Sequence, residues 1–422
     1  MLTGGGTTYM KQKKMGALTL SGFIIGPVLG SGIFILPPIV HSIAKEWAIV
    51  AWVVMILISF MVAFIFGFLS IQFPGDGGAT NAIEHVFGTY VKRLAAFYLI
   101  IGVTFGAAAV LLTAGQYIEK LGGISSLSTG YILLPLCIAL LLARVNLVGK
   151  IALVMSIVSA AVLFIGGAKS LIVSADNMVI TSSFNVSDFS YALLILFWAV
   201  FGWEVIGNYS ADVKDPKKTI TKAILLSIVA ISVVDLIVAA AVQWSDAGLP
   251  GGGDLTITGI MYPVFGEMSH LVMAGLALFL CCSTYFFVCR RHIQTGCLAG
   301  KGRRIAKTAG QAICQDVPYA AVLFIFVLNT LVLTGVQAGI FSLEKLVAFA
   351  NSFLTMNALI GICAGIVLIP NRFIKASGML LSVIIIGMLA FHSTAISLVI
   401  MILLAVYYVG KQLVSNKKAK AL

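Results

Sequence analysis

The segment Gly26-Pro27-Val28-Leu29-Gly30-Ser31-Gly32-Ile33-Phe34 interrupts the first apolar run of the chain, which extends over residues 17–41. The whole run has the length of a membrane-spanning helix. Three glycines and a proline within seven residues are expected to break that helix in the middle of the membrane. Unpaired backbone groups are tolerated there only where protein or a cavity surrounds them. Close helix packing through small residues is the alternative interpretation, but the added proline favours a break.

The composition around this segment is that of a protein solvated by lipid. Of the 422 residues, 60% are hydrophobic and 10% are charged, and the mean hydropathy is +1.08. Soluble proteins carry roughly 25% charged residues, so this chain has too few to cover a water-exposed surface. The sequence therefore predicts an all-α integral membrane protein.

Twelve apolar runs qualify as transmembrane helices by length and lack of charge. The clearest is 47–70, which contains no charged residue. The predicted helices are 17–41, 47–70, 90–118, 130–144, 149–173, 188–210, 219–244, 268–290, 317–337, 344–369, 375–391 and 393–410.

The positions of lysine and arginine predict the orientation of these helices. With the N-terminus in the cytoplasm, only Lys45, Lys120, Lys169 and Lys345 of the 27 basic residues fall on the outer side. Both termini, 1–16 and 411–422, are then cytoplasmic tails of a multi-pass protein of the plasma membrane, the bacterial inner membrane. The net charge of +12 is accordingly a topology signal and not a nucleic-acid-binding patch.

A second irregular segment, Phe197-Trp198-Ala199-Val200-Phe201-Gly202-Trp203-Glu204, lies in the sixth predicted helix. It places a glycine and a carboxylate within an apolar span, where a charge is costly and by default functional. The alternative for Glu204 is a hydrated position near the cytoplasmic end of the helix.

The two irregular helices lie five helices apart and begin the two halves of a single transporter domain, 1–422. An odd offset means that matching five-helix units, 17–173 and 188–369, have opposite orientations, with helices 11 and 12 (375–410) added. Paired broken helices in inverted repeats are typical of a midplane substrate site. Half-helix N-termini attract an anion and exposed carbonyls attract a cation, so the substrate is expected to be a zwitterion such as an amino acid.

Four motifs resemble those of the amino acid–polyamine–organocation (APC) transporters, whose fold is a 5+5 inverted repeat (LeuT-like) with broken helices 1 and 6. Each motif is weak alone, but the four occur in order at fitting topological places. They are Gly30-Ser31-Gly32-Ile33-Phe34-x-x-Pro37, Phe73-Pro74-x-x-Gly77-Gly78 with Phe87-Gly88, Trp198-x-x-Phe201-Gly202-x-Glu204, and Asp212-x-Lys214-Asp215-Pro216-x-Lys218-x-Ile220.

The resemblance implies a set of substrate-binding residues. Backbone N–H groups of the first break and its serine hold the substrate carboxylate in this family, and carbonyls on both breaks hold the ammonium. The matching positions are Val28, Gly30, Ser31, Gly32, Trp198, Phe201 and Gly202.

Three residues are candidates for gating or proton coupling. The resemblance implies that Trp198 closes over the substrate and that Glu204 lies beside the inner gate. Trp198 as an ordinary packing residue is the alternative. Asp235 lies in an apolar run of the seventh helix and is a second proton-relay candidate, or else a structural hydrogen-bonding residue.

Other polar residues within the apolar runs have two interpretations. These residues either line a cavity or, more commonly, make hydrogen bonds between helices; they are Ser283, Thr284, Asn351, Ser352, Thr355 and Asn357.

Two departures from the family pattern concern the shape of the first break, at Pro27, and the coupling ion, in the fifth helix. Pro27 stands where relatives more often have a small or polar residue. The region 153–160 of the fifth helix lacks the lysine that replaces a bound sodium in several proton-coupled relatives. Protons are the candidate coupling ion, and a homodimer is the candidate assembly.

The predicted function is secondary transport of a neutral, apolar L-amino acid by alternating access, as a permease, exporter or antiporter. Among bacterial members, exporters of methionine and branched-chain amino acids and antiporters are the most similar. A polyamine or cationic amino acid antiporter is the alternative. A membrane-embedded lipid-modifying enzyme and a channel or receptor are alternatives of other classes. No cofactor, metal or ATP is expected, because no phosphate-binding loop or ligand cluster occurs.

Overall fold

The computed structural model describes residues 15–74, 78–142, 145–174, 178–203, 206–207, 210, 213–244, 257–300 and 319–420. All regular elements among these residues are helices, joined by one isolated parallel bridge between Met15 and Val213. The α-helices are α1 (Ala17–Leu29), α2 (Gly32–Ala44), α3 (Ala48–Gln72), α4 (Gly78–Phe87), α5 (Thr89–Glu119), α6 (Ser126–Leu140), α7 (Val145–Val173), α8 (Val186–Leu196), α10 (Pro216–Trp244), α11 (Ile257–Phe265), α12 (Ser269–Gly300), α14 (Tyr319–Gln337), α15 (Leu343–Leu368), α16 (Arg372–His392) and α17 (Ala395–Lys420). Three 3₁₀ turns, η1 (Lys45–Trp47), η3 (Phe197–Val200) and η4 (Gly266–Met268), join or extend them.

Nine helical stretches in the described part of the chain are long and apolar enough to cross a membrane. One of them, Gly32–Gln72, includes both α2 and α3, which a positive φ of 51° at Lys45 separates. Three further apolar helices are too short to qualify, namely Ala17–Gly26, Ser126–Leu140 and Val186–Val200. The first and third of these belong to predicted helices 1 and 6, which are short because they are interrupted. The described residues thus form helices only, nine stretches of which could cross a membrane, and the count of twelve spans stays a prediction.

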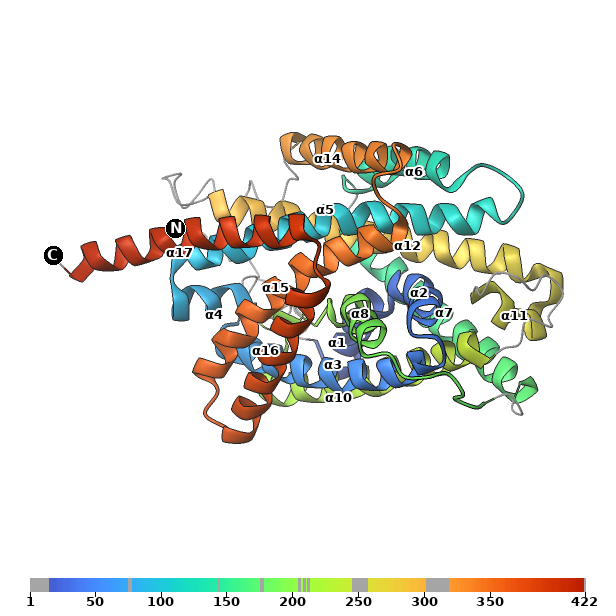
Figure 1. The fold of residues 1–422 in the computed structure, drawn as a ribbon, viewed down its shortest axis with the longest axis horizontal. Coiled ribbons are helices and arrows are strands. Elements are labelled where there is room, and N and C mark those ends of the chain that lie inside the picture. The colour runs from blue at the N-terminus through green and yellow to red at the C-terminus, as the bar shows by residue number, and fades with distance from the viewer. Residues whose placement is uncertain are drawn as a thin grey trace, which may run out of the picture.

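The long helix α5 packs along both α12 and α15. On one edge α6 and α14 lie beside it, and α10 packs against α1, α3 and α7 (Figure 1). The helices that contain the two interruptions, α1–α2 and α8–η3, lie between these groups. Their side chains belong to one continuous buried core that includes Trp52, Phe197 and Trp203.

The outer faces of the peripheral helices are strongly apolar. Leu331 of α14, Phe391 of α16 and Val406 of α17 are each more than 60% exposed. Exposed apolar surface on this scale is not found on soluble monomers, and it identifies the faces that meet lipid.

Several predicted helix boundaries are wrong. The eighth and twelfth helices were expected to end at 290 and 410, but α12 continues to Gly300 and α17 to Lys420. Apolar runs mark where lipid ends, whereas a helix continues into water as long as its residues favour helix. The short helices α4 and α11 were not predicted, because they are too short to span a membrane and lie in predicted loops.

Candidate functional site

The first interruption separates α1 from α2 at Gly30 and Ser31. The N–H of Gly30 donates to the carbonyl of Gly26 (2.9 Å), which closes the last turn of α1. The Ser31 carbonyl accepts from the N–H groups of Phe34 (3.1 Å) and Ile35 (3.2 Å) and so begins α2. The first-turn N–H groups of a helix have no intrahelical acceptor, so those of Gly32 and Ile33 are available to another acceptor.

Ser31 presents an unused hydroxyl at this interruption. The residue is 1% exposed, and its N–H donates to Oγ1 of Thr284 on α12 (3.2 Å). Its own Oγ does not cap α2 and has no hydrogen-bond partner among the residues that the structure describes. A buried polar group without a partner costs about 1–3 kcal/mol. An acceptor or a water at this point would remove that cost.

The second interruption follows α8. The helix ends at Leu196, η3 continues it to Val200, and Phe201 has an extended backbone (φ −74°, ψ 112°). Gly202 then adopts a φ of 145°, which L side chains rarely adopt and glycine tolerates. The carbonyl of Trp198 accepts from the N–H of Phe201 (3.1 Å). Glu204 lies outside the described residues, so its predicted role has no structural account here.

Asn351 of α15 stabilises the end of α8. Its Nδ2 donates to the carbonyls of Leu194 (2.9 Å) and Ile195 (2.7 Å), two of the last carbonyls before the helix tightens into η3. Asn351 and Thr284 therefore both hydrogen-bond between helices, and each holds one of the two interruptions. For Asn351 and Thr284, the interpretation as residues that make hydrogen bonds between helices is therefore correct.

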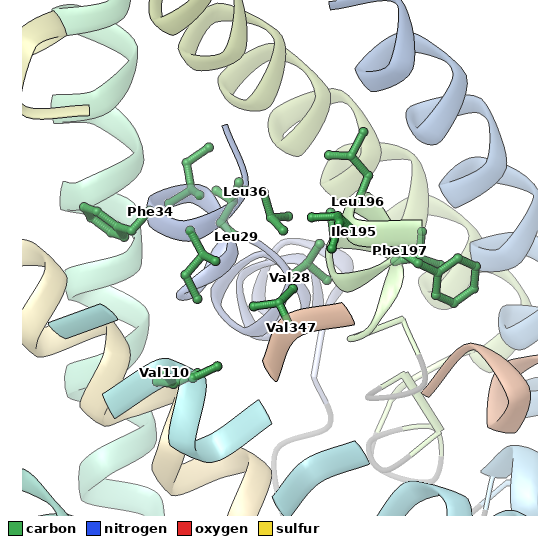
Figure 2. Close-up of a cluster of buried hydrophobic side chains, with 14 of the residues drawn as sticks. Val28, Leu29, Phe34, Leu36, Val110, Ile195, Leu196, Phe197 and Val347 are labelled. Carbon is green, nitrogen blue, oxygen red and sulfur yellow. The ribbon is translucent and has the colours of Figure 1, made fainter. Parts of the chain in front are cut away.

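The two interruptions meet in the core. Figure 2 shows Val28 and Leu36 of the first interrupted helix close to Ile195 of the second, within one buried cluster. A Cβ built on Gly202 would lie 2.7 Å from Cγ2 of Val28, so only glycine allows this approach. The structure thus brings together backbone from both broken helices, as a site shared between them requires.

Trp198 bridges the gap between the first interruption and α5. A Cβ at Gly32 would lie 3.2 Å from Cδ1 of the indole, and a Cβ at Gly106 would lie 3.0 Å from Cη2. The half-buried indole therefore extends from the first turn of α2 to the middle of α5. Phe201, by contrast, packs against the cluster of Leu99, Val103 and Leu354.

Gly106 is a site residue that the sequence reasoning missed. It forms a small-xxx-small pair with Gly102, where a Cβ would lie 2.7 Å from Cγ of Leu354 on α15. Such a spacing signals close helix approach and was available in the sequence. What the spacing does not say is that the partner at Gly106 is the indole of Trp198.

A cavity of about 680 Å³ opens beside α2, at the end of the bundle where α5 ends and α15 begins. Phe34 lies in its wall, with its ring edge-on to Tyr117 (5.5 Å between centroids). The other lining residues are Ile35, Pro38, Ile39, Ser42, Gln116, Glu119, Lys120, Ser342, Leu343 and Glu344.

Asp235 does not join the residues of the first interruption. It is 4% exposed and lines a small pocket between α3, α10 and the second interruption. In the same pocket Nε1 of Trp203 donates to Oγ of Ser59 (2.6 Å). Ala199 and Trp203 form the pocket wall contributed by the second interruption.

Proteins of known function that are similar in sequence to this chain are amino acid transporters. The model of a family described as amino acid permease matches residues 15–417. The L-methionine/branched-chain amino acid exporter of Escherichia coli is 22% identical over 398 residues, which cover 90% of this chain and 93% of the exporter. The human large neutral amino acids transporter small subunit 2 is 25% identical over 83% of this chain and 69% of its own. The mouse Asc-type amino acid transporter 1 is 28% identical over 51% of this chain and 45% of its own. The match extends over nearly the whole chain and includes both interruptions, and the chain belongs to the amino acid permease family of the APC superfamily.

Proposed function

We propose that this protein is a secondary active transporter that moves a neutral, apolar L-amino acid across the membrane by alternating access. The observation that carries the proposal is the meeting of the two interruptions, where Ser31 presents a buried Oγ without a partner in the described chain. The proposed frame is twelve helices with a 5+5 inverted repeat, in which 17–173 and 188–369 are the repeats and 375–410 is an addition.

The proposed site holds the substrate by its two charges. The carboxylate binds Ser31 Oγ and the first-turn N–H groups of α2, where the helix dipole favours an anion. The ammonium binds carbonyls at the ends of the broken helices, from Val28, Trp198 and Phe201. The carbonyl of Trp198 already accepts one hydrogen bond and has a second lone pair for the ammonium. Gly30, Gly32 and Gly202 allow the backbones to approach, and the indole of Trp198 acts as the gate.

The surroundings of the interruptions support an apolar side chain on the substrate. Val28, Phe34, Val110 and Val347 contribute to the buried apolar cluster there (Figure 2). The names of the relatives refer to methionine, branched-chain and large neutral amino acids. A cationic amino acid or polyamine would need a carboxylate near its charged end, whereas the described carboxylates Glu119 and Glu344 lie in the wall of the 680 Å³ cavity, at the end of α5 and the start of α15.

The arrangement of the two ends supports an outward-facing state. The 680 Å³ cavity opens at the predicted outer end. At the other end Met15, just before α1, pairs with Val213, and its carbonyl accepts from the N–H of Lys214 (3.3 Å). This proposal places both termini in the cytoplasm and the protein in the bacterial inner membrane. Glu204 as an inner-gate residue, protons as the coupling ion and a homodimer stay predictions.

Reconstitution tests the proposed function. Purified protein in liposomes, preloaded with unlabelled leucine, is expected to take up radiolabelled leucine and methionine saturably. Unlabelled leucine should compete with both substrates, and arginine should not. The same assay with net efflux, uptake and exchange arms establishes whether the protein imports, exports or exchanges. Absence of saturable flux for leucine, methionine, alanine and arginine would contradict amino acid transport, whereas arginine flux alone would favour the cationic alternative.

A further inference from the structure

The pocket around Asp235 lies on the side of the second interruption that faces away from the proposed substrate site. We propose that it is a proton-binding site, with the Asp235 carboxyl as the proton acceptor. This inference rests on the proposed transport function and deepens it by naming where the coupling proton is held.

The carboxyl of Asp235 is isolated in the described structure. It is 4% exposed, and no hydrogen bond or ion pair to it occurs among the described residues. An ionised carboxylate without a partner is costly in apolar surroundings. The Asp235 carboxyl is therefore expected to hold a proton in this packing and to gain water when it loses that proton. The rest of the pocket lining is uncharged and consists of Trp52, Met55, Ile56, Ser59, Ala199, Trp203, Ile228, Ile231 and Ser232.

The elements packed against α10 offer no compensating charge in the described pocket. Neither α1 nor α3 contains a titratable side chain. On the other helices that contact α10, the titratable residues are His41 of α2, Lys150 and Lys169 of α7, and Tyr262 of α11. His41, Lys169 and Tyr262 do not line the pocket, and Lys169 is exposed, whereas the side chain of Lys150 lies outside the described part of the structure. Lysines 217, 218 and 222 lie in the first two turns of α10 itself, three or more turns from Asp235. Glu204 lies outside the described residues.

The size and oxygen content of the pocket favour a proton over a metal ion. Hard cations in proteins take about six or more oxygen ligands. The lining supplies side-chain oxygens only from Ser59, Ser232 and Asp235, and Ser59 already accepts from Trp203. The cavity volume of about 10 Å³ is close to the minimum that one water molecule needs.

The second interruption connects this pocket to the proposed substrate site. Trp198 and Gly202 contact Gly32 and Val28 on one side, and Ala199 and Trp203 line the pocket on the other. A proton taken from water protonates an Asp235 oxygen and favours the close packing of side chains around this pocket. Its release to water leaves a carboxylate, which favours a conformation in which the segment moves and water enters. Substrate and proton thus act on the same short segment, which gives a coupling free energy between the two sites.

The test uses reconstituted full-length protein with a pH dye inside the liposomes. Leucine added to the wild type is expected to drive proton movement across the membrane, and a pH gradient is expected to drive leucine accumulation. Asp235→Asn should keep leucine exchange within about threefold of wild type and lose at least 90% of both proton responses. Asp188→Asn is the matched control, because Asp188 is an exposed carboxylate at the start of α8 and should behave as wild type.

Moving the carboxyl group from position 235 to position 232 distinguishes a proton-binding role of Asp235 from a purely structural one. Ser232 lies one turn before Asp235 and lines the same pocket. The double variant Ser232→Asp/Asp235→Ser is therefore expected to regain at least part of the proton response. Unchanged proton responses in Asp235→Asn would overturn the inference, as would a folded, exchanging double variant without any response. Wild-type leucine exchange without proton movement would overturn this inference alone and leave the proposed transport function standing.

Discussion

At the scale of single residues, the site depends on one hydroxyl and three glycines. Ser31 is fixed by its N–H bond to Thr284, which leaves its Oγ at the start of α2 with nothing described to bind. Gly32, Gly106 and Gly202 each leave the space of one methyl group, and Trp198 or Val28 fills it. Adding or removing one heavy atom at these contacts is therefore expected to change substrate binding or transport measurably.

Removing the Ser31 hydroxyl is expected to weaken substrate binding. A hydrogen bond to a charged group contributes about 1.5–3 kcal/mol, so Ser31→Ala should raise the Kd for leucine about 10- to 100-fold. Equilibrium binding of radiolabelled leucine to purified protein measures this. Ser70→Ala is the control, because the Ser70 hydroxyl bonds only to the carbonyl of Phe66 in its own helix (2.7 Å). An unchanged Kd in Ser31→Ala would remove Ser31 from the site.

A methyl group at Gly106 is expected to displace the gate. The alanine Cβ would lie 3.0 Å from Cη2 of Trp198, which is closer than most van der Waals contacts, so the indole must shift. Gly106→Ala should therefore lower kcat/KM for leucine exchange about tenfold or more. Gly275→Ala, where nothing lies within 4 Å, should not.

Replacing the Trp198 indole by the smaller ring of phenylalanine tests whether this clash causes the loss of transport. If the clash with Trp198 causes the defect, Trp198→Phe should relieve part of it in the Gly106→Ala background, although it impairs the wild type. A double-mutant cycle on kcat/KM measures this interaction. Strictly additive losses would contradict a direct contact between the two residues.

At the scale of elements, each interruption is held by one polar residue from a continuous helix. Asn351 of α15 holds the end of α8, and Thr284 of α12 holds the start of α2. Backbone groups freed by a broken helix need such partners in a membrane, where water is not available to take their place. The interruptions are therefore positioned by the scaffold and are not merely weak points of the helices.

Replacing Asn351 is expected to destabilise the protein more than replacing another buried asparagine. Asn351→Ala removes two hydrogen bonds to carbonyls of α8, at about 0.5–1.5 kcal/mol each, and leaves those carbonyls with the N–H of Phe197, which they share with the carbonyl of Leu193. Asn329→Ala removes a single bond to Ile325, within α14 itself. The midpoint of thermal denaturation in detergent should accordingly fall further for Asn351→Ala. Equal shifts would show that the bonds to Leu194 and Ile195 do not stabilise the break.

The sequence predicts these elements better than their contacts. Helix 47–70 agrees with α3 within two residues, because an uncharged run of that length has only one stable form in lipid. Proline and glycine likewise predict a break between residues 26 and 32. Local sequence does not say which side chains face each other, so the contact of Gly106 with Trp198 was missed. For the same reason, the position of Asp235 behind the second interruption could not be inferred.

At the scale of the whole molecule, the two ends of the described bundle differ: the 680 Å³ cavity opens at one end, and Met15 pairs with Val213 at the other. At the open end, the Glu46 carboxylate accepts from Thr181 and from the N–H of Ser182 (2.7 Å). Gln243 at the end of α10 donates to the Glu46 carbonyl (2.8 Å). These bonds join the turn after α2, the segment before α8 and the end of α10. The turn leads into α3 and the segment leads into α8, so the bonds link α3, the helix before the second interruption and α10, which are expected to move together.

Labelling of introduced cysteines tests which side of the membrane this open end faces. Ser42 is exposed in the wall of the 680 Å³ cavity, and Ser415 is exposed near the end of α17. A membrane-impermeant maleimide should modify Ser42→Cys in intact cells and Ser415→Cys only in inverted vesicles, with each site quantified by mass spectrometry. Saturating leucine should slow the reaction at position 42, because occlusion closes the cavity, and leave that at position 415 unchanged. Labelling of Ser42→Cys only in inverted vesicles would reverse the proposed orientation. If Ser42→Cys is labelled from outside at the same rate with and without leucine, closure of this cavity during transport would instead be contradicted.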